Sequence, residues 1–124
     1  MKPEIAKILD HFHITYRINN YSDGTFFFCC LPPPNKLTFD LFEKTDSVRL
    51  WRFIGTAPSS RIGTKWEHQK QPLGVTGLEV TAEGDICLYT ELSIDENDPQ
   101  KVKKISGTVD GYSKMIKRLK NIKI

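Results

Sequence analysis

Residues 98–120, DPQKVKKISGTVDGYSKMIKRLK, contain the pattern that decides the fold. Apolar side chains recur there at alternating intervals of three and four, which predicts an amphipathic helix with one buried stripe. Asp98 is a preferred N-cap residue and Pro99 suits a first helical turn, so we expect the helix to begin there. The chain is therefore expected to end in a long helix whose apolar stripe comprises Val102, Ile105, Val109, Tyr112, Ile116 and Leu119.

Two glycines interrupt this helix, Gly107 and Gly111, four residues apart. Each lowers helix stability by roughly 1 kcal/mol relative to alanine. Because glycine has no side chain, such a pair also lets another backbone approach closely. We therefore take both glycines as candidate contact positions.

Upstream of the helix, apolar residues follow the two-residue period of β-strands. Short turns separate most of these segments, including one at Asp23-Gly24, so we expect antiparallel neighbours. Residues 5–12 instead show helical spacing. The sequence predicts one α+β domain over residues 1–124: an antiparallel β-meander sheet of about six strands, an N-terminal helix and the long C-terminal amphipathic helix. The predicted strands are residues 14–19, 25–31, 37–42, 48–54, 76–81 and 86–92.

Two predicted strands carry more aromatic residues than a half-buried strand needs. Residues 25–31 are apolar on both faces, which predicts a strand that is central or covered by a helix. In residues 48–54, Arg49 shares one face with Trp51 and Phe53. These three either form an arginine–aromatic surface, or the aromatics lie in the core with Arg49 at its edge. The core is favoured because large aromatics dominate small cores.

Residues 55–74 lack regular periodicity and are broken by glycine and proline. Unstructured loops of this length are uncommon in compact domains. Three interpretations stay open: a functional loop, a mobile loop, or a short helix near residues 61–69. The segment holds Arg61, Lys65, Trp66, His68 and Lys70, a basic cluster with an aromatic residue that can stack on a base, as in single-stranded nucleic-acid binders.

Charge is segregated along the chain, although the net charge is only +3. Residues 76–98 contain seven acids and no base, whereas residues 99–124 contain eight bases and one acid, local balances of −7 and +7. The basic helix is expected either to meet an anionic partner, to be solvated, or to be neutralised by the acidic hairpin before it.

Residues with catalytic or metal-binding chemistry show no recognisable spacing. The three cysteines and three histidines form no Cys-x-x-Cys pair, and no glycine-rich phosphate loop is present. Cys29 and Cys30, as neighbours in a strand, face opposite sides of the sheet. We predict no cofactor and no metal. An odd number of cysteines and the lack of an apolar run of membrane-spanning length favour a cytoplasmic protein with free thiols.

Two parts of the chain resemble a known family. Residues 5–30, with Asp23-Gly24 at their turn, are similar to its first half. Residues 78–92, LEVTAEGDICLYTEL, followed by the helix from Asp98, are similar to its strand, Gly-Asp turn, strand and closing helix. The family is the YbjN-like group, whose fold is similar to that of type III secretion chaperones; it carries a central helix where this chain has residues 55–74. The resemblance implies a protein-binding, often dimeric module without catalytic residues.

The interpretation that the sequence favours is a non-enzymatic protein-interaction module, chaperone-like and homodimeric, whose partner is a protein. The alternative is a single-stranded nucleic-acid-binding protein that uses the basic and aromatic loop. A second alternative is a small thiol or metal-dependent enzyme, which would need Cys29, Cys30 or Cys87 to be reactive. The candidate partner-contact residues are Arg61, Lys65, Trp66, Lys70, Gly107, Gly111 and Arg49.

Overall fold

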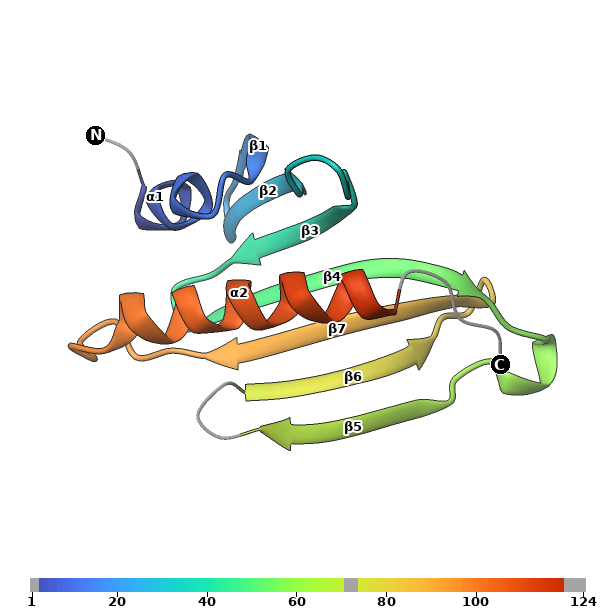
Figure 1. Cartoon of the computed structure of the whole chain (residues 1–124). Helices are drawn as coiled ribbons and strands as arrows, with labels where there is room; N and C mark the ends of the chain where they lie inside the picture. The colour runs from blue at the N-terminus through green and yellow to red at the C-terminus, as the bar shows by residue number, and fades with distance from the viewer. Residues whose placement is uncertain (1–2, 71–73, 120–124) are drawn as a thin grey trace.

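The computed structural model describes residues 3–70 and 74–119, and the side chains of residues 69 and 70 lie outside the description. It shows an N-terminal helix, a seven-stranded antiparallel sheet and a C-terminal helix, which confirms the α+β class (Figure 1). The elements are α1 (Glu4–His11), β1 (Thr15–Tyr21), β2 (Gly24–Cys30), β3 (Thr38–Glu43), β4 (Ser47–Thr56), the 3-10 helix η1 (Ser59–Arg61), β5 (Lys65–Lys70), β6 (Gly74–Val80), β7 (Asp85–Ser93) and α2 (Lys101–Arg118).

The strands lie in the order β1-β2-β3-β4-β7-β6-β5, so the expected simple meander is wrong after β4. There the chain crosses to the far edge of the sheet, and β5, β6 and β7 return strand by strand until β7 pairs with β4. The order follows from burial. β7 is apolar on both faces and takes a central place, whereas the charged β5 takes the edge.

Residues 55–74 hold the seventh strand, which the sequence did not reveal. The expected irregular loop or short helix is replaced by η1 and β5. β5 has the sequence KWEHQK, in which one apolar residue stands among polar ones. An edge strand can be this polar because only one of its sides pairs within the sheet.

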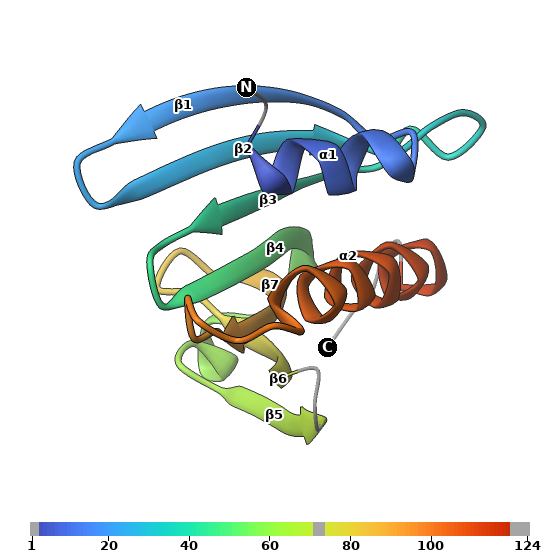
Figure 2. The ribbon, with the colours of Figure 1, turned by 90° about the vertical axis from the view of Figure 1, so that its left-hand side faces the viewer.

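Both helices lie on the same face of the sheet (Figures 1 and 2). α1 covers the part formed by β1 to β3, and α2 packs on β4 and β7 and contacts α1. The predicted stripe of α2 is confirmed at its centre, where Ile105, Val109, Tyr112 and Ile116 are buried, although Val102 is 46% exposed. β2 is second from the edge rather than central, and it is covered by a helix, as expected, on one face: α1 lies over its core side, and no described helix lies over its outward side.

The start of α2 differs from the expected one. The helix begins at Lys101, and Asp98 is not its N-cap. The Asp98 carboxylate instead accepts a hydrogen bond from the Gln100 backbone N–H at 2.8 Å and another from the Lys104 ammonium. Asp98 therefore forms the turn that leads into the helix, which is the other common role of an aspartate at such a position.

Candidate functional site

The face of the sheet opposite the helices carries aromatic side chains where an antiparallel sheet is normally polar. Register places these residues on one surface, which we call the aromatic face. Phe28 is 48% exposed and Phe53 54% exposed, while the others are half-buried. The rings of Phe26 and Trp51 pack at 6.0 Å between centroids. The aromatic face consists of Phe26, Phe28, Phe42, Trp51 and Phe53.

The expectation that Trp51 and Phe53 belong to the core is therefore wrong. The core side of β4 is formed by Val48, Leu50 and Ile54, which are at most 3% exposed. These aliphatic residues already fill the space beneath α2, so the alternate positions of the strand point outward. Arg49 lies on the outward side beside the aromatics, as the other interpretation required.

A network of charged side chains joins the aromatic face to β5, β6 and β7. The Arg49 guanidinium lies 4.5 Å from the Tyr89 ring centroid, and it pairs with Glu91 at 3.6 Å and Glu79 at 4.0 Å. The Tyr89 hydroxyl donates to Glu67 Oε1 at 2.6 Å, and the same oxygen lies 2.9 Å from Lys65 Nζ. Burial and the hydrogen bond to Glu67 raise the pKa of Tyr89. These contacts fix the geometry of the surface and leave its cations paired with acids.

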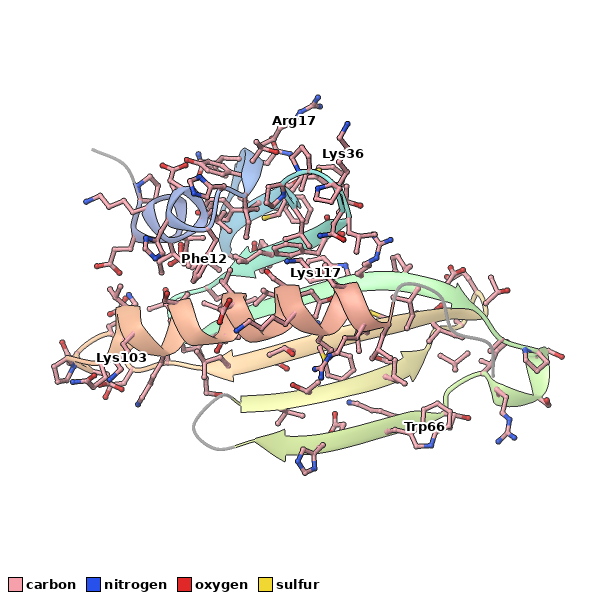
Figure 3. The ribbon with its side chains drawn as sticks, in the orientation of Figure 1. Phe12, Arg17, Lys36, Trp66, Lys103 and Lys117 are labelled. Carbon is pink, nitrogen blue, oxygen red and sulfur yellow. The ribbon has the colours of Figure 1, made fainter. Side chains whose placement is uncertain are left out.

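The structure does not bring the predicted basic cluster together. Lys65 lies on the same face as Arg49, but Trp66 points to the opposite face, where it is aligned with Leu78 and the core residue Leu88 (Figure 3). Arg61 is exposed at the end of η1. Lys70 ends β5, and its side chain lies outside the described part. An aromatic base-stacking platform lined by these cations is thus not formed by the residues that the structure describes.

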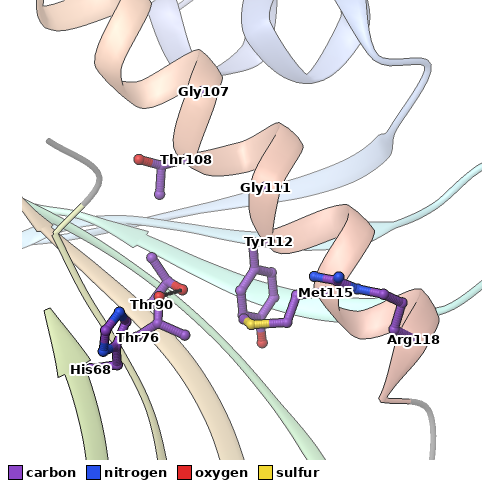
Figure 4. Close-up of a pocket in the computed structure, with 9 residues that line it drawn as sticks. All are labelled: His68, Thr76, Thr90, Gly107, Thr108, Gly111, Tyr112, Met115 and Arg118. Atoms are coloured by element: carbon purple, nitrogen blue, oxygen red, sulfur yellow. Dashed lines mark hydrogen bonds between the residues drawn. The ribbon is translucent and has the colours of Figure 1, made fainter. Parts of the chain in front are cut away.

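The two glycines of α2 border a cavity of about 130 Å³ between that helix and the strands (Figure 4). A Cβ built on Gly111 would meet no atom within 4 Å, so none of the described chain approaches it closely. The hydroxyls of Thr76 and Thr90 lie 3.0 Å apart on the strand side. We call this cavity and the helix flank above it the α2 groove; its lining residues are His68, Thr76, Thr90, Gly107, Thr108, Gly111, Tyr112, Met115 and Arg118.

The acidic segment before α2 does not neutralise the helix. From that segment, Asp98 is the acid with a described ion pair to α2, through Lys104. Glu79 and Glu91 pair instead with Arg49 on the opposite face of the sheet. Within the described residues, Lys103, Lys117 and Arg118 of α2 have no ion pair, and Lys103 and Lys117 project from the helix in Figure 3. α2 therefore keeps a basic surface.

The fold buries two of the three thiols. Cys29 and Cys87 are buried, and burial raises the pKa of both thiols, which opposes formation of the reactive thiolate. Over residues 3–70 and 74–119, no group of three or more His, Cys, Asp or Glu side chains could hold a metal ion. None of the helices in those ranges has the length and apolar character needed to cross a membrane.

Comparisons with protein-family models, with curated proteins and with solved structures found no match to this chain.

Proposed function

We propose that the protein is a non-enzymatic protein-interaction module that forms a homodimer through its aromatic face. The observation that carries this proposal is the set of five outward-facing aromatic residues over which no described element lies. Exposed apolar patches of this kind are rare on monomers, and they usually mark interaction sites. Aromatic side chains are also the residues that contribute most to interface energies.

The charges on this face favour a second copy as the occupant. Register places three bases there, Arg17, Arg49 and Lys65, and five acids, Asp40, Glu67, Glu79, Asp85 and Glu91. Both signs of charge are present and several of these groups are already paired with one another, so an identical surface is repelled only weakly. The face also offers no excess of positive charge to a polyanion, so nucleic acid is disfavoured as its partner.

The whole outward side of the sheet, of which the aromatic face occupies β2, β3 and β4, is large enough for a stable dimer. Seven strands of about seven residues span roughly 29 Å by 24 Å, or about 700 Å², before the relief of the side chains is added. Standard protein interfaces bury about 800 Å² per partner. Two such sheets can pack face to face as the layers of a sandwich, about 10 Å apart and related by a two-fold axis. The resemblance to the YbjN-like group, whose members are often dimeric, favours a dimer.

Multi-angle light scattering over a concentration series tests the proposal. We expect the mass to rise to twice the 14.2 kDa of the chain. The double variant Phe28→Ser with Phe53→Ser is expected to stay monomeric while keeping its circular dichroism spectrum. The control is Ile62→Ser, because Ile62 is 45% exposed but lies beside η1, away from the aromatic face. A strict monomer at every concentration, or a dimer that both variants leave intact, would overturn the proposal.

The nucleic-acid alternative has its own test on the same protein. We expect no salt-dependent mobility shift with single-stranded oligonucleotides, because Arg49 and Lys65 are paired with carboxylates and Trp66 lies on the other face. A shift at low salt that Lys65→Ala and Trp66→Ala both weaken would favour that alternative instead.

A further inference from the structure

The α2 groove lies beside a part of the sheet that no helix of the described residues covers. α2 packs on β4 and β7, and β6 and β5 extend past it on the same face (Figures 1 and 2). Two strand spacings amount to about 9.6 Å. Packed helices lie about 8–10 Å apart. The strip above β6 and β5 is therefore as wide as one more helix laid beside α2.

The side chains of this strip are suited to contact with another helix. Trp66 is 41% exposed and Leu78 is half-buried against the core, and both face the side of α2. The cavity of about 130 Å³ between α2 and these strands is close to the size of cavities that hold a benzene ring, and so could take one side chain of a docked helix. The strip is thus apolar enough to bury surface and hollow enough to receive an anchor.

The glycines of α2 face this strip. Gly107 and Gly111 line the cavity, and a Cβ built on Gly111 would meet no atom of a described neighbouring element within 4 Å. Glycine weakens a helix, and at position 111 the packing of the described chain does not require it. A neighbouring helix would benefit from both positions, because its backbone could approach α2 without meeting a Cβ.

A hydrogen-bond donor is also left over in the cavity. The hydroxyls of Thr76 and Thr90 share one hydrogen bond, so one of their two hydrogens has no acceptor among the described contacts. Either hydroxyl can be the donor in this pair, and Thr90 is only 5% exposed while Thr76 is half-buried, so the remaining hydrogen lies at the wall of the cavity. A carboxylate or amide side chain entering the cavity would supply the missing acceptor.

Charge decides which kind of helix fits. Arg118 lines the groove and has no ion pair among the described residues, whereas Lys114, elsewhere on α2, pairs with Asp110. The facing positions of β5 and β6 hold Trp66, His68, Thr76 and Leu78 and no carboxylate. A second copy of α2 would bring more positive charge against this flank and is excluded as the occupant, whereas an acidic helix is complementary.

We infer that the α2 groove binds an acidic amphipathic helix of a partner protein, laid beside α2 and over β6 and β5. This inference rests on the proposed function and names the partner of a second surface. The groove and the aromatic face lie on opposite sides of the sheet, so one homodimer has room for two such helices. A dimer that holds a partner helix on each subunit would act in a chaperone-like way.

The test uses the full ¹⁵N-labelled chain and two synthetic peptides. The first repeats leucine and alanine at helical spacing on one side and glutamate on the other; the second has lysine in place of every glutamate. We expect the glutamate peptide to shift amide resonances of Gly107, Gly111, Thr76 and Trp66, and the lysine peptide to shift none of them. Gly111→Leu fills the groove and favours the helix, so it is expected to weaken binding at least tenfold in a folded protein.

Two further variants separate this inference from the proposed function. Arg118→Glu reverses a charge of the groove and is expected to weaken binding of the glutamate peptide. The double variant Phe28→Ser with Phe53→Ser is expected to be monomeric and to bind the glutamate peptide with the affinity of the wild type. The inference is overturned if the glutamate peptide causes no shifts, if both peptides bind equally, or if the shifts map to the aromatic face. A monomeric wild type that still binds the peptide in the groove would remove the homodimer and leave the inference standing.

Discussion

The Arg49 guanidinium of β4 stacks 4.5 Å from the Tyr89 ring centroid of β7, between the carboxylates of Glu79 and Glu91. Cation–π contact and two ion pairs thus converge on one side chain at the central strand pair of the sheet. Arg49 therefore both links β4, β6 and β7 and keeps two acids of the outer face neutralised.

Replacing Arg49 with alanine is expected to lower the free energy of unfolding by about 1 kcal/mol. Exposed ion pairs contribute little, and most of the loss comes from the contact with Tyr89 and from the two carboxylates left facing each other. Urea unfolding measures the change. Arg17→Ala is the matched control on the same face and is expected to stay within about 0.5 kcal/mol of the wild type. Equal stabilities of the Arg49 and Arg17 variants would contradict the proposed role of Arg49.

The glycines of the chain are expected to respond oppositely to alanine. Gly111→Ala should raise stability by up to about 1 kcal/mol, because the helix gains propensity and the new Cβ meets no atom within 4 Å. Gly77→Ala should lower stability by about 1–3 kcal/mol through overpacking, because its Cβ would lie 2.6 Å from the Trp66 carbonyl oxygen and 2.7 Å from the Tyr89 hydroxyl. Thermal unfolding of the two variants distinguishes these outcomes. A Gly77→Ala variant that is more stable than the wild type would contradict the close packing of Gly77 against Trp66 and Tyr89.

Stability is expected to decline in alkali because of two tyrosines. Burial raises the pKa of Tyr112, and burial with the hydrogen bond to Glu67 raises that of Tyr89. The unfolded chain releases these protons near pH 10, while the folded chain retains them. The two tyrosines therefore make their full contribution to the free energy of unfolding below pH 10. Above pH 10 this free energy falls by about 1.4 kcal/mol per pH unit for each tyrosine that stays protonated in the folded chain.

Tyr112→Phe tests this pH dependence. The variant loses the hydrogen bond from the Tyr112 hydroxyl to the Leu88 carbonyl oxygen, so it is expected to be about 1 kcal/mol less stable at pH 8. Its stability should then fall less steeply than that of the wild type between pH 10 and 11, so the two curves approach each other. Curves that stay parallel in urea unfolding across this range would contradict the raised pKa.

The three thiols are expected to differ in their reactivity toward Ellman's reagent. Cys29 is fully buried and Cys87 is 5% exposed, whereas Cys30 is half-buried. Because burial raises the pKa of the first two, only Cys30 should react in the native protein, and Cys30→Ala should remove that phase. Rapid native labelling of Cys29 or Cys87 would instead support the thiol-enzyme alternative.

The fold class followed from periodicity, and the exceptions have physical causes. The apolar positions of α1 and α2 repeat cleanly because one face of each helix is buried. β5 was not found because an edge strand with a mostly polar sequence carries no such period. The crossing from β4 to β5 was not predicted, because the residues of a loop do not indicate which strand the following strand will pair with.

The aromatic face could have been predicted from the sequence. The prediction failed because two helices can cover only one of the two faces of the sheet. β2 is apolar on both of its faces, because Phe26 and Phe28 point to one side of the sheet and Phe27 to the other. Such a pattern is typical of a strand with two buried faces. Two helices cover only one side of a seven-stranded sheet, so one aromatic set had to remain outside. The contact of Arg49 with Tyr89 depends on the pairing of β4 with β7, strands about forty residues apart, and no local pattern specifies it.

The two tryptophans lie on opposite faces of the sheet, and this placement gives the most direct test of the homodimer. Trp66→Phe leaves Trp51 of the aromatic face as the single fluorophore, and Trp51→Phe leaves Trp66. On dilution through the dissociation range, the emission maximum of the Trp66→Phe variant is expected to shift to longer wavelength as Trp51 becomes exposed to water, while that of the Trp51→Phe variant stays constant. A constant emission from Trp51 through a dissociation seen by light scattering, or a shift from Trp66 alone, would contradict an interface at the aromatic face.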